Sequence, residues 1–264
     1  MLADEVLAYY RQLGETDRLR VRASGRLEFL RTWDLLGRLL PAPPARVLDV
    51  GGATGIYAGP LAAAGYRPHV VDPVPEHVDA AAALPGVTAA LGDARALPEP
   101  DGSADAVLLL GPLYHLLERA DRGTAWREAA RVVRPGGVVL AATISRFASA
   151  FDGFARDFYA EPGYAAVVDG ALRTGAHRPV ANAWFTTAYF HHPDEPPAEA
   201  AEAGLEPAGR YAIEGPGWHL PRLEAILDDP RRRGQLMDFL RRVESEPSLL
   251  GATSHLLTAA RRRS

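Results

Sequence analysis

The segment Val47-Leu-Asp-Val-Gly-Gly-Ala-Thr-Gly55 is the most informative part of this 264-residue chain. A short apolar strand runs into a glycine-rich turn, and a helical pattern follows the turn. Glycines in such a turn allow positive φ angles and let a ligand approach the backbone closely. The first turn of the following helix offers free N–H groups to a carboxylate or a phosphate. The stretch therefore predicts a ligand-binding strand–turn–helix unit, although a tight turn that binds nothing has the same outline.

Strand and helix patterns alternate along the rest of the chain, as expected for a parallel sheet with crossover helices. The predicted strands cover residues 46–50, 68–71, 87–91, 106–110, 138–143, 205–213 and 255–260. Two amphipathic helices are predicted within 1–40, and further helices end near 64 or cover 122–133, 194–203 and 222–245. The Arg-Pro-Gly-Gly sequence at 134–137 predicts a turn into the fifth strand. These patterns predict an α/β protein.

Composition limits the chemistry that this chain can perform. It contains no cysteine and no lysine, which excludes disulfides, Schiff-base chemistry and the lysine-containing phosphate loop. The net charge of −4 does not suggest the basic surface of a nucleic-acid-binding protein, so we expect no nucleic-acid partner. No apolar run approaches the roughly 20 residues that span a bilayer, and no signal peptide is visible. We therefore expect a cytoplasmic protein without a membrane partner.

The spacing of the glycines separates two classes of cofactor. Dinucleotide-binding enzymes use G-x-G-x-x-G, and neither Gly51 nor Gly52 begins such a pattern, which argues against an NAD-dependent oxidoreductase. Asp49, Gly51 and Gly55 instead match the pattern D-x-G-x-G-x-G, in which Ala53 replaces the middle glycine. The alanine implies slightly less room at the backbone there.

Two further acidic residues follow predicted strands. Asp72 lies 21 residues after Gly51 and ends the second strand, where an acid can bind both hydroxyls of a ribose. Asp93 ends the third strand and precedes Ala94. Either acid alone could belong to a structural turn. Three strand-end acids in this order favour a nucleoside site.

Over residues 45–145 the chain resembles the UbiE-like branch of class I S-adenosylmethionine-dependent methyltransferases. The matching segments are VLDVGGATG, HVVDPVPEHV, GDARALP, SADAVLLLGPLYHL and REAARVVRPGGVVLAA. The resemblance implies a Rossmann-like fold with a seven-stranded, mostly parallel sheet of order 3-2-1-4-5-7-6, in which the last strand is antiparallel. It implies S-adenosylmethionine as the cofactor and S-adenosylhomocysteine as its product.

The resemblance also assigns roles to residues. Asp93 is expected to face the adenine amino group, while the Ala94 N–H meets a ring nitrogen. The carbonyls of Leu110 and Gly111 are expected to accept from the amino group of the cofactor. The full set of expected cofactor residues is Asp49, Gly51, Gly52, Ala53, Gly55, Asp72, Pro73, Asp93, Ala94, Leu110, Gly111, Tyr10 and Arg31.

The expected division of this single domain follows from the same comparison. Residues 1–44 form an N-terminal helical lid, 45–145 the cofactor-binding core, 146–193 a substrate cap and 194–264 the C-terminal part of the sheet. Related enzymes often fold their first helices over the cofactor, which is why Tyr10 and Arg31 are included among the cofactor residues.

The segment after the fourth strand supplies the catalytic candidates. Ligands of parallel sheets lie beyond the carboxyl ends of the strands, which places residues 111–115 beside the reacting methyl group. His115 is the candidate general base because an ordinary histidine pKa suits proton transfer at neutral pH. Tyr114 is a candidate for orienting the substrate. Structural packing explains either residue equally well, and no base is needed where the acceptor has no proton to lose.

Aromatic residues are concentrated between residues 146 and 193, which suggests a cap over an apolar pocket. We expect Trp184, Tyr189 and His191 to reach the substrate, although some of these aromatics must simply hold the cap together. His191 and His192 would point to opposite faces of an extended segment and have no acidic partner at ligand spacing, so no metal site is expected.

These observations favour an enzyme that methylates a small molecule, with aromatic or heteroaromatic metabolites as one acceptor class. Methylation of RNA or a protein is the alternative, and a non-catalytic cofactor-binding module is another. The acceptor atom and the oligomeric state are left open.

Overall fold

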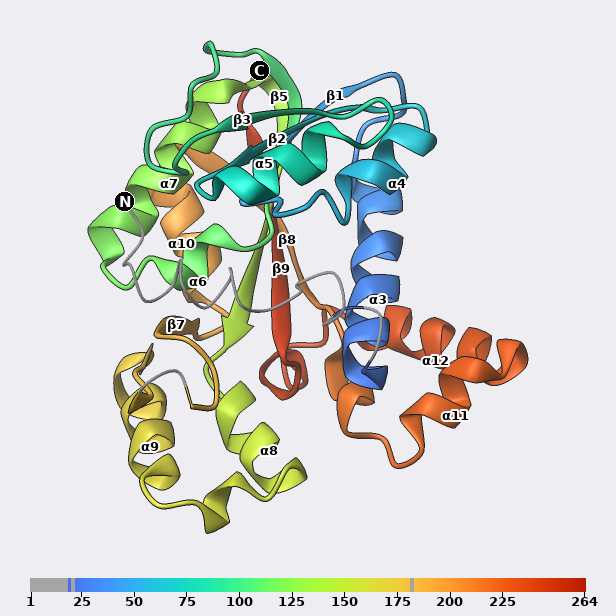
Figure 1. The fold of residues 1–264 in the computed structure, drawn as a ribbon, viewed down its shortest axis with the longest axis vertical. Coiled ribbons are helices and arrows are strands. Elements are labelled where there is room, and N and C mark those ends of the chain that lie inside the picture. The colour runs from blue at the N-terminus through green and yellow to red at the C-terminus, as the bar shows by residue number, and fades with distance from the viewer. Residues whose placement is uncertain (1–18, 20–21, 181–182) are drawn as a thin grey trace.

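The computed structural model describes residues 19, 22–180 and 183–264, and within them a single sheet carries helices on both faces (Figure 1). The strands are β1 (Arg46–Val50), β2 (Arg67–Asp72), β3 (Thr88–Leu91), β4 (Ala104–Leu109), β5 (Val133–Ser145), β6 (Ala176–His177), β7 (Ala188–His191), β8 (Leu205–Ala212) and β9 (His255–Arg262). The α-helices are α3 (Ala23–Leu39), α4 (Ala58–Ala63), α5 (Pro75–Ala82), α6 (Pro112–His115), α7 (Arg119–Val132), α8 (Ala148–Ala155), α9 (Tyr164–Thr174), α10 (Glu195–Glu202), α11 (Leu223–Asp228) and α12 (Pro230–Val243).

The order of the strands confirms the predicted Rossmann-like topology. β3, β2, β1, β4 and β5 are neighbours in that order and run parallel. β9 then pairs antiparallel with β5, and β8 pairs antiparallel with β9. With β8 and β9 as the sixth and seventh strands, this is the order 3-2-1-4-5-7-6. The sequence pattern did not predict the short β6–β7 hairpin. Its strand β7 pairs in parallel with the carboxyl end of β5.

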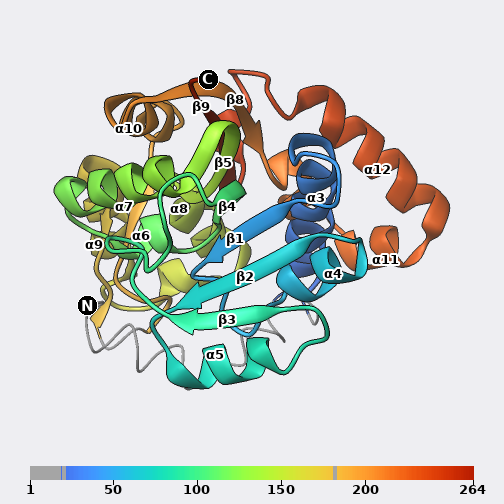
Figure 2. The same cartoon turned by 90° about the horizontal axis from the view of Figure 1, so that it is seen from above.

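Alternating side chains of the central strands fill two apolar layers. Leu48 of β1 packs with Trp126 of α7 on one face of the sheet. Val47 packs with Leu35 of α3 and Leu61 of α4 on the other face. Figure 2 shows α7 and α10 on one side of the strands and α3, α4 and α12 on the other. Burial on both faces explains why the strands are continuous apolar runs.

Two predicted elements differ in the structure. β5 begins at Val133, so the predicted turn at 134–137 lies inside the strand, at a shift in its register with β4. The predicted helix 222–245 is two helices, because Asp229 caps a new helix that starts at Pro230. The Asp229 carboxylate accepts from the amides of Arg231 and Arg232, a common way to begin a helix.

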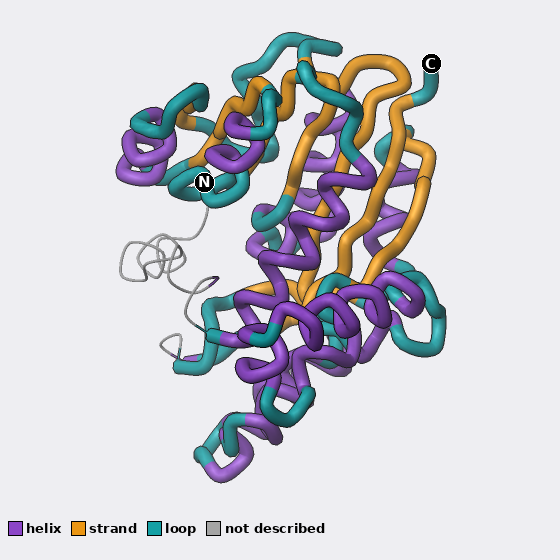
Figure 3. Tube along the Cα trace, turned by 90° about the vertical axis from the view of Figure 1, so that its right-hand side faces the viewer, coloured by secondary structure: helices purple, strands orange, loops and turns teal. Residues whose placement is uncertain are grey.

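The carboxyl ends of β1–β5 lie at the same edge of the sheet because these strands are parallel. β8 also ends at this edge, and β9 begins there, because these two strands run in opposite directions. Figure 3 shows the strands side by side, with several helices beyond one end of the sheet. Within the described residues, no helix combines the length and the apolar character needed to cross a bilayer.

Candidate active site

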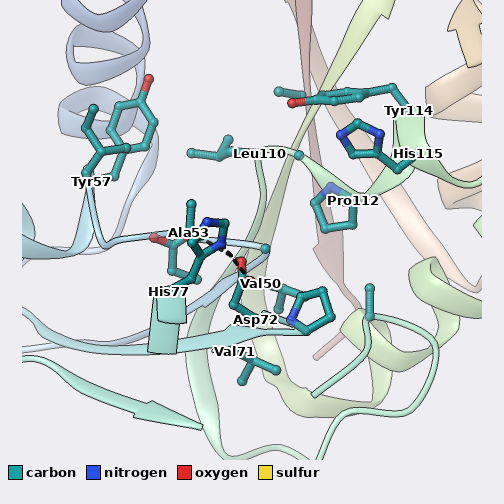
Figure 4. A pocket seen from close by; sticks show the side chains of 18 of the residues that line it. Val50, Ala53, Tyr57, Val71, Asp72, His77, Leu110, Pro112, Tyr114 and His115 are labelled. Carbon is teal, nitrogen blue, oxygen red and sulfur yellow. Dashed lines mark hydrogen bonds and ion pairs between the residues drawn. The ribbon is translucent and has the colours of Figure 1, made fainter. Parts of the chain in front are cut away.

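A cavity opens at the carboxyl edge of the sheet, beside the glycine-rich turn (Figure 4). Its walls come from the ends of β1, β2 and β3, from the segment after β4, and from α3 with the β8–β9 pair. The predicted residues that line it are Asp49, Gly51, Gly52, Ala53, Asp72, Pro73, Asp93, Ala94, Leu110, Gly111, Tyr114 and His115. The topology thus brings together residues that are up to 66 positions apart in the chain.

Small residues shape the turn between β1 and α4. Gly51 and Gly55 have φ angles of +68° and +83°, which favour glycine. A Cβ atom on Gly51 would lie 2.9 Å from Cγ of Pro112, so this position also needs a hydrogen side chain. Ala53, at the position of the middle glycine of the D-x-G-x-G-x-G pattern, has a φ of +48°, a conformation that strains an alanine. Gly55 does not line the cavity and contributes through the shape of the turn.

Asp49 is a buried carboxylate without a hydrogen-bond partner among the described residues. Its residue is 1% exposed, and neither side-chain oxygen is bonded. Burial, together with the nearby Asp72 carboxylate, raises the pKa of Asp49 to about 7. A Cβ atom on Gly52 would lie 2.6 Å from Oδ2 of Asp49, so the missing side chain leaves this carboxylate room. A protonated amine would supply the donors that Asp49 lacks.

Asp72 is held in one orientation at the end of β2. Its Oδ2 atom accepts from the amide of Ala53 at 3.0 Å, and its Oδ1 atom accepts from the amide of Val74 at 3.0 Å. Nδ1 of His77 lies 3.0 Å from the same Oδ1 atom (Figure 4). Each carboxylate oxygen has two acceptor positions. Oδ2 therefore retains capacity for a ribose hydroxyl, which fits the expected role.

Asp93 lies at the cavity wall but is already paired with Arg95. The Arg95 guanidinium donates to both carboxylate oxygens, at 2.9 and 2.7 Å, and also contacts Asp121 at 2.9 Å. The hydrogen bonds from Arg95 keep the pKa of Asp93 below its ordinary value. Arg95 was not predicted as a site residue. An adenine amino group would share the Asp93 carboxylate with it, while the Ala94 backbone remains at the wall.

Tyr114 and His115 lie on α6, directly after the end of β4 and the Leu110-Gly111 segment. The two rings meet edge to face with centroids 4.5 Å apart. Burial lowers the pKa of His115 to about 3, so its imidazole is neutral at physiological pH but only weakly basic. Figure 4 shows Tyr57 on one side of the cavity and Tyr114 with His115 on the other. This position suits substrate contact better than proton abstraction.

Two predicted cofactor residues on the N-terminal segment have different outcomes. Tyr10 lies outside the described residues. Arg31 is fully buried and does not line the cavity. Its guanidinium donates to the Ile213 carbonyl at 3.0 Å, to Asp34 at 2.9 Å and to Glu244 at 2.5 Å. The prediction for Arg31 is therefore corrected: its donors are used to join α3 to the C-terminal part of the chain.

Tyr189 and His191 also lie away from the cavity. The Tyr189 hydroxyl donates to Glu195 at 2.8 Å, and the guanidinium carbon of Arg122 lies 3.7 Å from the ring centroid. His191 is fully buried, with its Nε2 atom 3.7 Å from Glu199. Pairing of β7 with the end of β5 directs both side chains toward α7 and α10. The expectation that they bind substrate is corrected accordingly.

Trp184 packs inside the cap and not at the cavity. Its Nε1 atom donates to Glu161 at 2.8 Å, and its ring meets Tyr164 edge to face at 5.0 Å. Tyr159 packs against the same tyrosine, with ring centroids 5.3 Å apart. These aromatics form a small separate core that holds α8 and α9 together. The structure therefore favours the packing explanation for them.

Other residues that line the cavity were not predicted from the sequence. They include Glu28 and Thr32 of α3, Tyr57, Ile213 and His255. Tyr57 lies two residues after Gly55, the end of the predicted motif, and stacks on Phe29 of α3, with centroids 5.4 Å apart. No local motif marks the other four, because their proximity depends on how α3 packs against the β8–β9 pair.

Comparison with known proteins shows a similarity to methyltransferases. Residues 47–137 match a family described as a methyltransferase domain. An uncharacterized methyltransferase of Mycobacterium tuberculosis is 45% identical over 100 residues, which are 38% of this chain and 40% of that protein. A ubiquinone biosynthesis O-methyltransferase of Methylocella silvestris is 34% identical over 116 residues, which are 42% of this chain and 44% of that protein.

A solved structure extends the likeness to the whole fold. It is a complex between the Haloferax volcanii Trm112 methyltransferase activator and a methyltransferase, with 19% sequence identity and a TM-score of 0.61. The alignment covers 100% of this chain and 98% of that one. At this identity the likeness concerns the fold alone.

Residues 47–137 match a methyltransferase domain, and the sheet order is that of class I methyltransferases, a class of proteins that use S-adenosylmethionine as their cofactor. The sequence matches span about 40% of the length of the curated relatives.

Proposed function

We propose that this chain transfers the methyl group of S-adenosylmethionine to a small molecule. The observation that carries the proposal is the buried, unbonded carboxylate of Asp49 at the cavity. Leaving such a group without partners is costly, and the protonated amino group of S-adenosylmethionine offers both charge and hydrogen-bond donors. The hydrogen-bonded Asp72 and the backbone at Ala94 provide positions for the ribose and the adenine of the same molecule.

The chain's own residues would act by positioning. When bound, S-adenosylmethionine supplies an activated methyl group, so the protein's task is to hold an acceptor in line with it. The turn at 51–53 and Asp72 hold one side of the cavity, and Tyr114 and His115 face it after β4. The cavity wall is largely apolar, which would favour the exclusion of water around a bound acceptor.

A small acceptor is supported by the character of the cavity. Its apolar lining includes Leu19, Ile56, Tyr57, Leu116 and Ile213, which suits a compact, partly aromatic molecule. Methylation of a macromolecule is the second candidate, because a protein of the same fold forms a complex with the Trm112 methyltransferase activator. The acidic net charge of −4 favours the small molecule over RNA.

Calorimetry with S-adenosylhomocysteine tests the cofactor site. We expect the wild-type protein to bind this product and not to bind NADH. Replacing Asp72 with Ala should weaken binding by about 1.5–3 kcal/mol, the range for hydrogen bonds to a charged group. The matched control is Asp101→Ala, because Asp101 is an exposed acid that pairs with Arg131 away from the cavity. Unchanged affinity in the Asp72 variant would refute its ribose role.

Labelled S-adenosylmethionine tests the acceptor. Incubation with pooled metabolites and, separately, with RNA and protein fractions should place the label in a small molecule. Label in a macromolecular fraction would support the second candidate. Cofactor binding without transfer to any fraction would support a non-catalytic module.

A further inference from the structure

A second group of polar side chains faces the same cavity from the side opposite Asp49. His255 begins β9, Glu214 follows the end of β8, and Glu28 lies on α3, which Figure 1 shows next to these strands. Nδ1 of His255 lies 2.6 Å from Oε1 of Glu214 and 3.8 Å from Oε2 of Glu28. His255 and Glu28 line the cavity, whereas Glu214 is buried behind them with 2% exposure.

The hydrogen bonds of Glu214 fix the proton on the imidazole of His255. The other carboxylate oxygen, Oε2, accepts from the backbone amide of His255 at 2.9 Å and from the Thr253 hydroxyl at 2.9 Å. Because this carboxylate acts as an acceptor throughout, Nδ1 of His255 must donate to Oε1 and therefore carries the proton. Nε2 is then the basic nitrogen. The same carboxylate stabilises the imidazolium that forms when Nε2 takes up a proton.

The position of His255 suits an acceptor-binding side chain. His255 is paired with Ile144, near the carboxyl end of β5, and Ala142 of the same strand also lines the cavity. Asp49 and Asp72 hold the other side, beyond β4. Ligands of such sheets lie beyond the carboxyl ends of the strands, so an acceptor would lie between these two groups. Among the described residues, the carboxylates close to the His255 ring are Glu28 and Glu214.

We propose that His255, positioned by Glu214, is the general base of the reaction and that the acceptor carries an O–H or N–H group. This inference rests on the proposed function. The acceptor oxygen or nitrogen forms a bond to the methyl carbon, and the carbon–sulfur bond breaks with its electron pair going to sulfur. The acceptor proton passes to Nε2 of His255 and then to solvent. Glu28 provides a second negative charge near the imidazolium.

His115, the base expected from the sequence, is less suited to this task. Burial lowers the pKa of His115 to about 3, which makes its imidazole a weak base. His255 has the carboxylate partner that a proton-accepting histidine needs.

Three variants test the proposal, with catechols, phenols and primary amines as probe acceptors and labelled S-adenosylmethionine. His255→Gln should reduce turnover by about 100-fold or more, since a general base contributes at least that much. Its affinity for S-adenosylhomocysteine should be unchanged. His69→Gln is the matched control, because His69 also lies near a glutamate, with Nε2 3.3 Å from Glu99, but outside the cavity. The control should keep full turnover.

Glu214→Gln separates a positioning role from a purely structural one. Loss of this carboxylate should lower the pKa of His255, measured by NMR titration of its imidazole, because the imidazolium loses a stabilising charge. The acid limb of the pH profile of kcat should move to lower pH by the same amount. This readout also serves if His255→Gln proves unstable on thermal melting.

The outcomes distinguish the two proposals. Failure of the wild-type protein to bind S-adenosylhomocysteine would contradict the proposed function itself. Normal binding together with full turnover in His255→Gln would overturn only the role of His255. Turnover with carbon nucleophiles but with none of the O–H and N–H probes would also overturn it, as would a pH profile that does not follow the His255 titration.

Discussion

Replacing Asp49 with Asn should remove a pH-dependent cost to folding. The folded-state pKa of Asp49 is raised from 3.8 to about 7, so this carboxyl favours the folded protein fully below about pH 4 and loses that contribution as the pH rises toward 7. With about 1.36 kcal/mol per pKa unit, the raised pKa costs the folded protein about 1.5 kcal/mol near pH 5, where only the unfolded state is ionised, and about 4 kcal/mol near pH 8, where both states are ionised. The wild type should therefore lose roughly 2.5 kcal/mol between these pH values relative to the variant.

Urea denaturation of both proteins at the two pH values measures this quantity. Comparing the change with pH in each protein cancels the cost that the buried amide of Asn carries at both pH values. Calorimetry should show that the same substitution weakens the binding of S-adenosylhomocysteine, because the neutral Asn side chain cannot neutralise the protonated amino group of this ligand. We expect binding to weaken by about 1.5–3 kcal/mol. Parallel stability curves for the two proteins, or unchanged ligand affinity, would refute the argument from the unbonded carboxylate.

Three other substitutions test the remaining assignments. Gly52→Ala places a Cβ atom 2.6 Å from Oδ2 of Asp49 and should weaken S-adenosylhomocysteine binding measurably in calorimetry, whereas Gly37→Ala, with nothing within 4 Å, should not. Arg31→Met removes one buried guanidinium from Glu244, which keeps Arg38 as its other partner, and should lower the free energy of unfolding by about 1.5–3 kcal/mol in urea, with ligand affinity of the folded protein retained. A variant of normal stability and weakened binding would restore its cofactor role. Tyr189→Phe should cost about 1 kcal/mol of stability and leave KM for the acceptor unchanged, and a raised KM would return this residue to the substrate site.

The cofactor side of the cavity could be predicted because short segments of sequence determine its geometry. The turn at 51–55 follows β1 directly, and Asp72 and Asp93 each follow the end of a strand. In a parallel sheet those ends converge, so the order of strands alone brings the acids together. The pattern also identified Ala53 as a position where glycine is expected, and this residue has a positive φ in the structure.

The direction in which a side chain points depends on long-range packing, which a local sequence pattern does not specify. Arg31 lies on an amphipathic helix near the cavity, but its guanidinium turns toward Glu244, more than 200 residues later. Tyr189 lies on an added strand, β7, and faces α7 and α10 because that strand pairs with the end of β5. An aromatic-rich insert predicts a core of some kind, but its residue types are the same whether they enclose a ligand or one another.

The same reasoning explains why the Glu214–His255 pair had no signal in the sequence. The two residues are 41 positions apart, and neither belongs to a motif. They meet because β8 and β9 are antiparallel, so the end of one strand and the start of the next lie at the same edge of the sheet. That edge is also where the parallel strands end, so the reversal of β9 brings a histidine to the cavity beside the cofactor residues. In this protein the parallel half of the sheet carries the acids expected to bind the cofactor, whereas β9 and α3 carry His255 and Glu28 on another part of the same cavity wall.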